Sequence, residues 1–196
     1  MNDVQIRTAL KRELLLQYKD DRETVVIEEL GLNHGTSRID LAVVNGVLHG
    51  FELKSDQDTL SRLPEQTSAY GAVFDRLTLV VAERHLRRAV DVLPDWWGIR
   101  VVHGKPGRLS FSDLKLPMNN PSPDALSIVS LLWRTEALSF LEELGGARGM
   151  YSRSRSEIYF KLIDTSNIDQ VRNRVRRCLR ERPDWRAVGR RLSCGD

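Results

Sequence analysis

The sequence predicts an α/β domain with a mixed β-sheet, followed by a small all-helical region. Three observations support this prediction. Residues 1–116 alternate between apolar residues at helical spacing and short apolar runs typical of strands. Residues 117–123 hold three prolines and two asparagines, a composition typical of a linker. Residues 124–196 show helical spacing and many arginines, so we expect a helical, arginine-rich region there.

The elements of the first region follow in order along the chain. Asp3 can cap a helix whose apolar residues recur at helical spacing as far as Tyr18. Residues 24–30, which begin with four β-branched residues, predict the first strand, and two more strands are expected on either side of a turn at Asn45 and Gly46. The remaining elements are a helix over 64–74, a buried strand over 77–82, a helix over 86–93, a strand over 99–102 and a small hairpin closed by 105–107.

The C-terminal region is expected to contain three helices. Apolar residues at helical spacing predict the first over residues 125–141, and two glycines, Gly145 and Gly146, follow it. A second helix passes through Ile158 and Leu162. The third, over about 167–182, carries an apolar stripe with arginines on its other faces.

The net charge of +3 hides two parts of opposite sign. Residues 1–143 carry 17 Lys or Arg against 21 acids, whereas residues 144–196 carry 13 against 6, a net charge of +7. A basic region beside an acidic domain is typical of a handle for a polyanion, although a basic helix face can also be merely solvated. The nucleic-acid hypothesis places the contacts on four arginines of the last helix, Arg172, Arg176, Arg177 and Arg180.

Composition also limits the cellular setting. Hydrophobic residues make up 41% of the chain, enough for a core, but no run of 18 apolar residues exists. The N-terminus lacks the basic-then-apolar pattern of a signal peptide. The two cysteines, Cys178 and Cys194, suggest neither a disulfide framework nor a zinc site. We therefore expect a cytoplasmic protein without a membrane partner.

A charged residue interrupts the second predicted strand. Asp40 lies among Ile39, Leu41 and Val43, and a charge in such a setting is unfavourable unless something binds it. Because strand side chains alternate between two faces, we expect the three apolar residues to point one way and Asp40 to point the other.

The third predicted strand carries two more charges. Glu52 and Lys54 share one face of this strand, and Phe51 and Leu53 share the opposite face. If the apolar faces of both strands pack on helices, then Asp40, Glu52 and Lys54 converge on the remaining face.

This convergence depends on the turn between the two strands. A three-residue loop over 44–46, with Gly46 in the left-handed region, would set Asp40 opposite Gly50 and diagonal to Glu52. A two-residue turn would separate the two carboxylates. We therefore predict the three-residue loop.

The three charged residues indicate a chemistry. Two carboxylates, from Asp40 and Glu52, together with the backbone carbonyl of Leu53 offer the oxygen ligands that Mg²⁺ or Mn²⁺ prefers. Lys54 can then stabilise charge on a phosphate or orient an attacking water. Metal-assisted phosphodiester hydrolysis fits this set, and a structural ion-pair network is the alternative.

The order of these residues resembles the PD-(D/E)XK phosphodiesterase superfamily. Asp40 precedes Glu52-Leu53-Lys54 by 12 positions, and residues 66–70, with Gln66 and Tyr70 at their ends, resemble the QxxxY element of RecB-like members. The proline usually written before the first Asp is absent, with Ile39 in its place. The resemblance covers roughly residues 1–104.

The resemblance implies a restriction-endonuclease-like αβββαβ core and roles for further residues. Gln66 would hydrogen-bond the phosphate, the metal-bound water or Lys54, and Tyr70 would pack or bond beside it. Glu13, Glu28 and Glu29 are available as an additional metal ligand, and by resemblance to members with an acid just before the Gly-rich turn, Glu29 is favoured. The expected function is a divalent-metal-dependent nuclease, with DNA favoured over RNA.

The competing hypothesis is a catalytically silent binding module. In this case the basic C-terminal helices would bind nucleic acid or another protein, and a homodimer is a further expectation. Asp40, Glu52 and Lys54 are all present in this chain, which favours activity.

Overall fold

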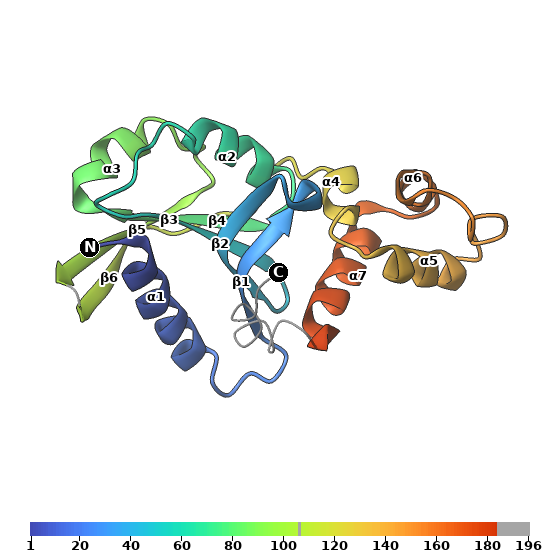
Figure 1. Cartoon of the computed structure of the whole chain (residues 1–196), viewed down its shortest axis with the longest axis horizontal. Helices are drawn as coiled ribbons and strands as arrows, with labels where there is room; N and C mark the ends of the chain where they lie inside the picture. The colour runs from blue at the N-terminus through green and yellow to red at the C-terminus, as the bar shows by residue number, and fades with distance from the viewer. Residues whose placement is uncertain (106, 184–196) are drawn as a thin grey trace, which may run out of the picture.

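The computed structural model describes residues 1–105 and 107–183, and Cys194 lies outside this part of the chain. These residues form a six-stranded mixed β-sheet with helices on both faces and a helical lobe at one end (Figure 1). The mixed α/β architecture with C-terminal helices predicted from the sequence is thus confirmed. The elements before the linker are α1 (Asp3–Gln17), β1 (Val25–Leu32), the 3₁₀ turn η1 (Asn33–Gly35), β2 (Ser37–Val44), β3 (Leu48–Lys54), α2 (Leu63–Gly71), β4 (Arg76–Ala82), α3 (Glu83–Val90), β5 (Gly98–Lys105) and β6 (Arg108–Lys115).

The helical lobe contains four helices within the described residues: α4 (Ala125–Val129), α5 (Arg134–Glu143), α6 (Arg155–Thr165) and α7 (Ile168–Glu181). The single helix expected over 125–141 is therefore two. The break has a local cause, because Trp133 takes an extended conformation and its N–H donates to the Glu136 carboxylate at 2.6 Å, which starts a new helix.

The sheet has the spatial order β1-β2-β3-β4-β5-β6. Strands β1, β2 and β3 form an antiparallel meander, β3, β4 and β5 are parallel, and β6 is antiparallel to β5. Helices α2 and α3 make the two parallel crossovers and lie on one face, while α1 covers the other (Figure 1).

Each face of the sheet has its own core. On the α1 face, Ile6, Leu10 and Leu14 of the helix pack on apolar strand residues such as Leu41 and Val43. On the other face, the sheet, α2 and the helical lobe share one continuous apolar cluster. The expected cap of α1 is corrected, because Asn2 and not Asp3 accepts the hydrogen bond from an N–H of the first turn.

The linker is held against the sheet domain. The side-chain amide of Asn120 donates to the backbone carbonyls of Gly71 and Phe74 at 2.6 and 2.8 Å. Its own N–H donates to the carbonyl of Asp75 at 2.8 Å. The helical lobe therefore continues the core of the sheet domain through a hydrogen-bonded segment. Among the described residues, no helix is long and apolar enough to cross a membrane.

The loop between β2 and β3 differs from the prediction in position and conformation. It has the expected three residues, but these are 45–47, because Val44 pairs with Leu48. Asn45 and Gly46 both have negative φ, so the left-handed glycine is wrong. The Asn45 side chain accepts a hydrogen bond from the N–H of Val47 at 3.2 Å, and this bond closes the turn without a left-handed glycine. This register brings Asp40 level with Glu52 instead of diagonal to it.

The alternation of side chains is interrupted in both β1 and β2. Ile27 and Leu30 pack on the same face although they are three residues apart, and so do Ile39 and Ala42. The expected shared face of Ile39, Leu41 and Val43 is therefore wrong. The interruption occurs where Glu29, with φ of 50°, leaves the ladder opposite Asp40.

Candidate functional site

A cavity of about 550 Å³ opens at the end of β3 where Lys54 lies. Its walls come from the first turn of α1, from β1, β2 and β3, and from α2 with the loop before it. The structure brings every residue of the predicted catalytic and metal-binding set to this cavity, namely Glu29, Asp40, Glu52, Leu53, Lys54, Gln66 and Tyr70.

Glu52 and Lys54 form the buried centre of the site. They are 2% and 4% exposed, and the Lys54 ammonium donates to Glu52 Oε1 at 2.7 Å. The two-residue spacing explains this contact, because both side chains leave the same face of β3. Burial raises the pKa of Glu52, and the positive charge of Lys54 opposes that rise.

Helix α2 adds Gln66 to this pair. The Gln66 amide nitrogen donates to Glu52 Oε1 at 2.6 Å, and its amide oxygen accepts from the Lys54 ammonium at 2.9 Å. Glu52, Lys54 and Gln66 therefore form a closed triangle of hydrogen bonds. The predicted partnership of Gln66 and Lys54 is present in the structure.

Tyr70 fixes α2 to the sheet at the site. Its hydroxyl donates to the backbone carbonyl of Arg38 at 2.6 Å and accepts from the Gln66 amide at 3.2 Å. Gln66 and Tyr70 are one helical turn apart and so lie on one face of α2. Burial and the nearby charge of Glu52 raise the pKa of Tyr70, so the phenol stays protonated.

Asp40 approaches from the neighbouring strand. Its Oδ2 accepts the backbone N–H of Leu53 at 2.8 Å, and its Oδ1 lies 3.9 Å from the Arg7 guanidinium. Burial and the negative charge of Glu52 raise the pKa of Asp40 to about 7. Two carboxylates that resist joint ionisation indicate a place where a cation would be stabilised.

The Leu53 carbonyl leaves β3 on the side of β2, the strand that carries Asp40. Within a strand, the N–H and the C=O of one residue point to the same side. Since the Leu53 N–H donates to Asp40, its carbonyl oxygen leaves β3 on the same side. Leu53 lines the cavity, in agreement with its expected place in the site.

Glu29 lines the cavity from β1, but its carboxylate is already paired. Arg7 donates to its Oε1 at 2.8 Å and Arg38 donates to its Oε2 at 3.1 Å. Arg7 also forms an ion pair with Asp3. Arg7 is a site residue that the sequence did not predict; its one signal there is the four-residue spacing from Asp3 on a helix.

One carboxylate oxygen of Glu52 bears on whether a divalent cation fits this site. Glu52 Oε2 is buried and has no hydrogen-bond partner, which is unfavourable for a carboxylate unless a cation or another donor completes it. Among the described residues, no group of three or more His, Cys, Asp or Glu side chains is placed to hold a metal. The fit therefore rests on Glu52, Asp40 and the Leu53 carbonyl, a set of hard oxygen donors.

Comparison with known proteins gives the chain a family. The family described as Bacteriophage P4 protein cII matches residues 2–188. The chain belongs to the P4 cII family. Over 62 residues it is 37% identical to Protein cII of Enterobacteria phage P4, and this stretch covers 32% of the chain and 24% of the phage protein. No solved structure matches it.

In this P4 cII family member, the four arginines predicted to bind nucleic acid are all engaged with the protein. Arg172 forms an ion pair with Asp75 at 3.1 Å. Arg176 donates to Asp75 at 3.2 Å and to the carbonyl of Gly46 at 2.6 Å. The other two pair with acids outside this cluster: Arg177 with Glu143 at 3.2 Å and Arg180 with Glu23 at 2.7 Å.

These contacts attach the helical lobe to the sheet domain. Asp75 is 8% exposed and also accepts the backbone N–H of Leu48 at 2.7 Å, so α7 is tied to β3 and β4 through one carboxylate. None of the four arginines lines the cavity that holds Glu52. The sequence could not anticipate this use of Arg172 and Arg176, because Asp75 is about 100 residues away in the chain.

Proposed function

We propose that the chain is a divalent-metal-dependent nuclease that hydrolyses phosphodiester bonds, with DNA the favoured polymer. The observation that carries this proposal is the convergence of Asp40, Glu52 and Lys54 in one cavity, with a buried oxygen of Glu52 left unsatisfied. The element order α1-β1-β2-β3-α2-β4 supports a restriction-endonuclease-like core of the PD-(D/E)XK type.

The ligands of Mg²⁺ or Mn²⁺ would be Asp40, Glu52 and the Leu53 carbonyl. Glu29 is the candidate for a further ligand, directly or through water, if it leaves its ion pairs with arginine. A bound divalent cation supplies a water of lowered pKa and positive charge next to the phosphate. These carboxylates would accept the cation most readily above pH 7, where Asp40 ionises.

The remaining residues act on position and charge. The Lys54 ammonium would donate to a non-bridging phosphate oxygen or orient the attacking water, which stabilises the charge that develops in the transition state. Gln66 holds Lys54 at 2.9 Å and thereby limits its rotamers. Tyr70 anchors Gln66, so it is a positioning residue.

A cleavage assay tests this proposal. The purified chain is incubated with Mg²⁺ or Mn²⁺ and with single-stranded, duplex and branched DNA and with RNA. We expect cleavage of at least one DNA form, its loss with chelator, and a loss of at least about a hundredfold in Glu52→Gln and in Lys54→Ala. No cleavage of any substrate, together with no metal binding by calorimetry, would refute the proposal.

The binding-module hypothesis stays a prediction. It would require the arginines of α7 to exchange their carboxylate partners for phosphates or for another protein. Removing the helical lobe is a poor test, because the lobe shares its core with the sheet. A cleaner comparison is Glu52→Gln against Arg177→Gln, since the Arg177 side chain is 46% exposed. A biological effect lost only in Arg177→Gln would favour the binding module.

A further inference from the structure

We propose that four exposed arginines, Arg62 at the cavity and Arg84, Arg87 and Arg88 on α3, form a surface that binds the phosphate backbone of a nucleic acid strand. We call these residues the α3 arginine row. The inference rests on the proposed function in that it names the surface that would deliver substrate to the cavity. The binding itself can be measured without cleavage.

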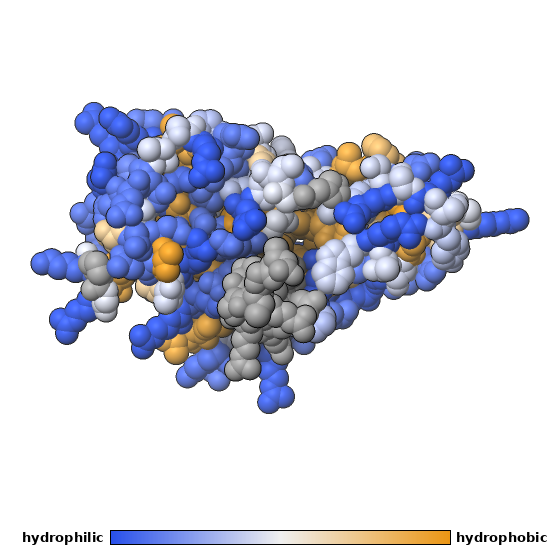
Figure 2. Space-filling view, viewed as in Figure 1, coloured by the Kyte–Doolittle hydropathy of each residue, from blue (hydrophilic) through white to orange (hydrophobic). Residues whose placement is uncertain are grey.

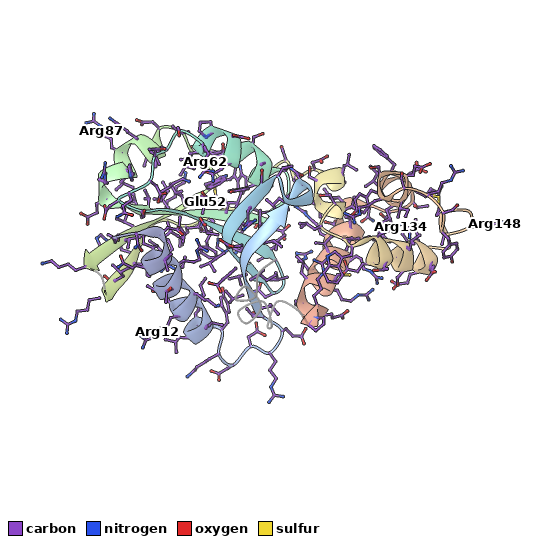
Figure 3. All side chains as sticks on the ribbon, viewed as in Figure 1. Arg12, Glu52, Arg62, Arg87, Arg134 and Arg148 are labelled. Carbon is purple, nitrogen blue, oxygen red and sulfur yellow. The ribbon has the colours of Figure 1, made fainter. Side chains whose placement is uncertain are left out.

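Arg62 stands at the mouth of the cavity. It is exposed, it lines the same cavity as Glu52 and Lys54, and it directly precedes α2 (Figure 3). Its backbone carbonyl accepts the N–H of Gln66 at 3.0 Å, so its backbone belongs to the first turn of α2. Within the described residues, its guanidinium has neither an ion pair nor a hydrogen bond.

Helix α3 continues the row from the loop that follows Lys54. The Arg84 guanidinium donates to the backbone carbonyl of Asp56 at 2.7 Å, only two residues beyond Lys54. Arg87 and Arg88 lie three and four positions after Arg84, so the three side chains share one face of the helix. His85 and Ala89, by contrast, are buried against the sheet.

The spacing along α3 suits a nucleic acid backbone. Four residues of helix advance about 6 Å along its axis. One DNA strand advances about 3.4 Å per nucleotide, so the part of the row on α3 spans roughly two phosphates. A guanidinium group binds a phosphate through two parallel hydrogen bonds, and its planar shape holds the two N–H donors in the required geometry.

Two of the acids near the row, Glu83 and Asp58, have other partners. Glu83 has the four-residue spacing that would let it pair with Arg87, yet its carboxylate bonds the His103 ring at 2.6 Å. Asp58 accepts the N–H of Ser55 at 2.7 Å. In the described part of the chain, Arg87 and Arg88 have no carboxylate partner.

The arginines of α7 differ from those of α3 in their partners. On α7 each predicted contact arginine has an acid partner, whereas Arg84, Arg87 and Arg88 of α3 are exposed and have no acid partner among the described residues. The surface over α2 and α3 is largely hydrophilic in Figure 2, and Arg87 projects from the outer end of α3 in Figure 3. In the described part of the chain, the candidate contact arginines without an acid partner therefore lie just before α2, at Arg62, and on α3, and not among the four predicted arginines of α7.

The test measures binding to labelled oligonucleotides in chelator, so that no cleavage occurs. Single-stranded DNA, duplex DNA and RNA are separate arms, and salt is varied from 50 to 200 mM. The variant is Arg87→Gln with Arg88→Gln, and Arg62→Gln is tested alone. The matched control removes two exposed arginines from elsewhere, Arg12→Gln with Arg148→Gln, which Figure 3 places on α1 and at the far tip of the lobe.

We expect the α3 double variant to bind about tenfold or more weakly than the wild type, with an unchanged melting temperature. Its slope of log affinity against log salt should fall by about 0.9 per lost contact on duplex DNA and about 0.7 on a single strand. Arg62→Gln should lower the slope by the amount expected for about one lost phosphate contact. The control should lower it by less than half of that amount. The arm with the largest effect identifies the polymer.

The inference is overturned if the wild type binds no oligonucleotide at 50 mM salt, or if the α3 variant loses no more affinity than the control. The proposed function fails separately. If the wild type cleaves and the α3 variant binds normally, the nuclease proposal stands and the row is wrong. If binding depends on the row but the wild type never cleaves with either metal, the row stands and the nuclease proposal is wrong.

Discussion

Replacing Asp40 by asparagine should make the metal-free protein more stable at pH 8. Burial and the charge of Glu52 raise the pKa of Asp40 from 3.8 to about 7 in the folded state. Between these values the unfolded chain binds fewer protons than the folded one, so the free energy of unfolding falls as pH rises through that window. It stays lowered above pH 7. An asparagine side chain at this position would carry no charge and could still accept the Leu53 N–H.

The size of the effect follows from the shift. A change from 3.8 to about 7 corresponds to about 4 kcal/mol, which is an upper limit. The Asp40 side chain is 21% exposed and Arg7 is 3.9 Å away, so solvent and counter-charge reduce the effect. We expect a gain of about 1–2 kcal/mol at pH 8, or a rise in melting temperature of about 2–8 °C for a chain of this size.

Thermal unfolding in chelator at pH 8 and pH 5 measures this gain. The advantage of Asp40→Asn should fall by about half at pH 5, because the wild-type carboxyl is then protonated in the folded state. Asp20→Asn, at an exposed position, is the matched control and should change little at either pH. Added Mg²⁺ should raise the melting temperature of the wild type and leave that of Asp40→Asn nearly unchanged.

One result would refute this reasoning. If Asp40→Asn is less stable than the wild type by the same amount at pH 8 and pH 5, the ionised carboxylate is not strained in the folded protein. The pair of carboxylates would then need no cation, and the main physical support for a metal site would be lost.

Three further substitutions test the contacts around the site and the lobe. Lys54→Met should lower the free energy of unfolding by about 3–5 kcal/mol at pH 8, because it leaves the buried Glu52 carboxylate without its partner, and adding Glu52→Gln should restore most of that loss. Tyr70→Phe removes two hydrogen bonds and should cost about 1–2 kcal/mol in urea denaturation, with slower cleavage if the nuclease proposal holds. Arg176→Ala should cost about 1–3 kcal/mol, whereas Arg177→Ala, at an exposed ion pair, should cost less than about 1 kcal/mol.

Each of these expectations has a result that contradicts it. A Lys54→Met protein as stable as the wild type would mean that Glu52 is neutral in the folded state at pH 8. Equal stabilities of Tyr70→Phe and the wild type would mean that the helix does not depend on its tether to β2. Equal losses for Arg176→Ala and Arg177→Ala would remove the special role of Asp75 in docking the lobe.

The sequence by itself determined the features that depend on local periodicity. Glu52 and Lys54 share a face because side chains in a strand alternate, and Gln66 and Tyr70 share a face because a helix repeats every 3.6 residues. The order of helices and strands in the sheet domain follows from the same two periods. The proline-rich boundary before the helical lobe is also a local feature, because proline and asparagine affect only the backbone of nearby residues.

The tertiary structure decided everything that depends on partners far apart in the chain. The break in the alternation of side chains occurs at Glu29 in β1 and at Asp40 in β2, which lie opposite each other. It depends on the pairing of the two strands, because the sequence of each strand taken alone looks regular. Likewise, the arginines of α7 look free in the sequence, but Asp75 meets two of them across about 100 residues. A sequence gives the net charge of a segment, but the ion pairs depend on which side chains meet in space. The arginines that remain free for a ligand are therefore known only once the chain is folded.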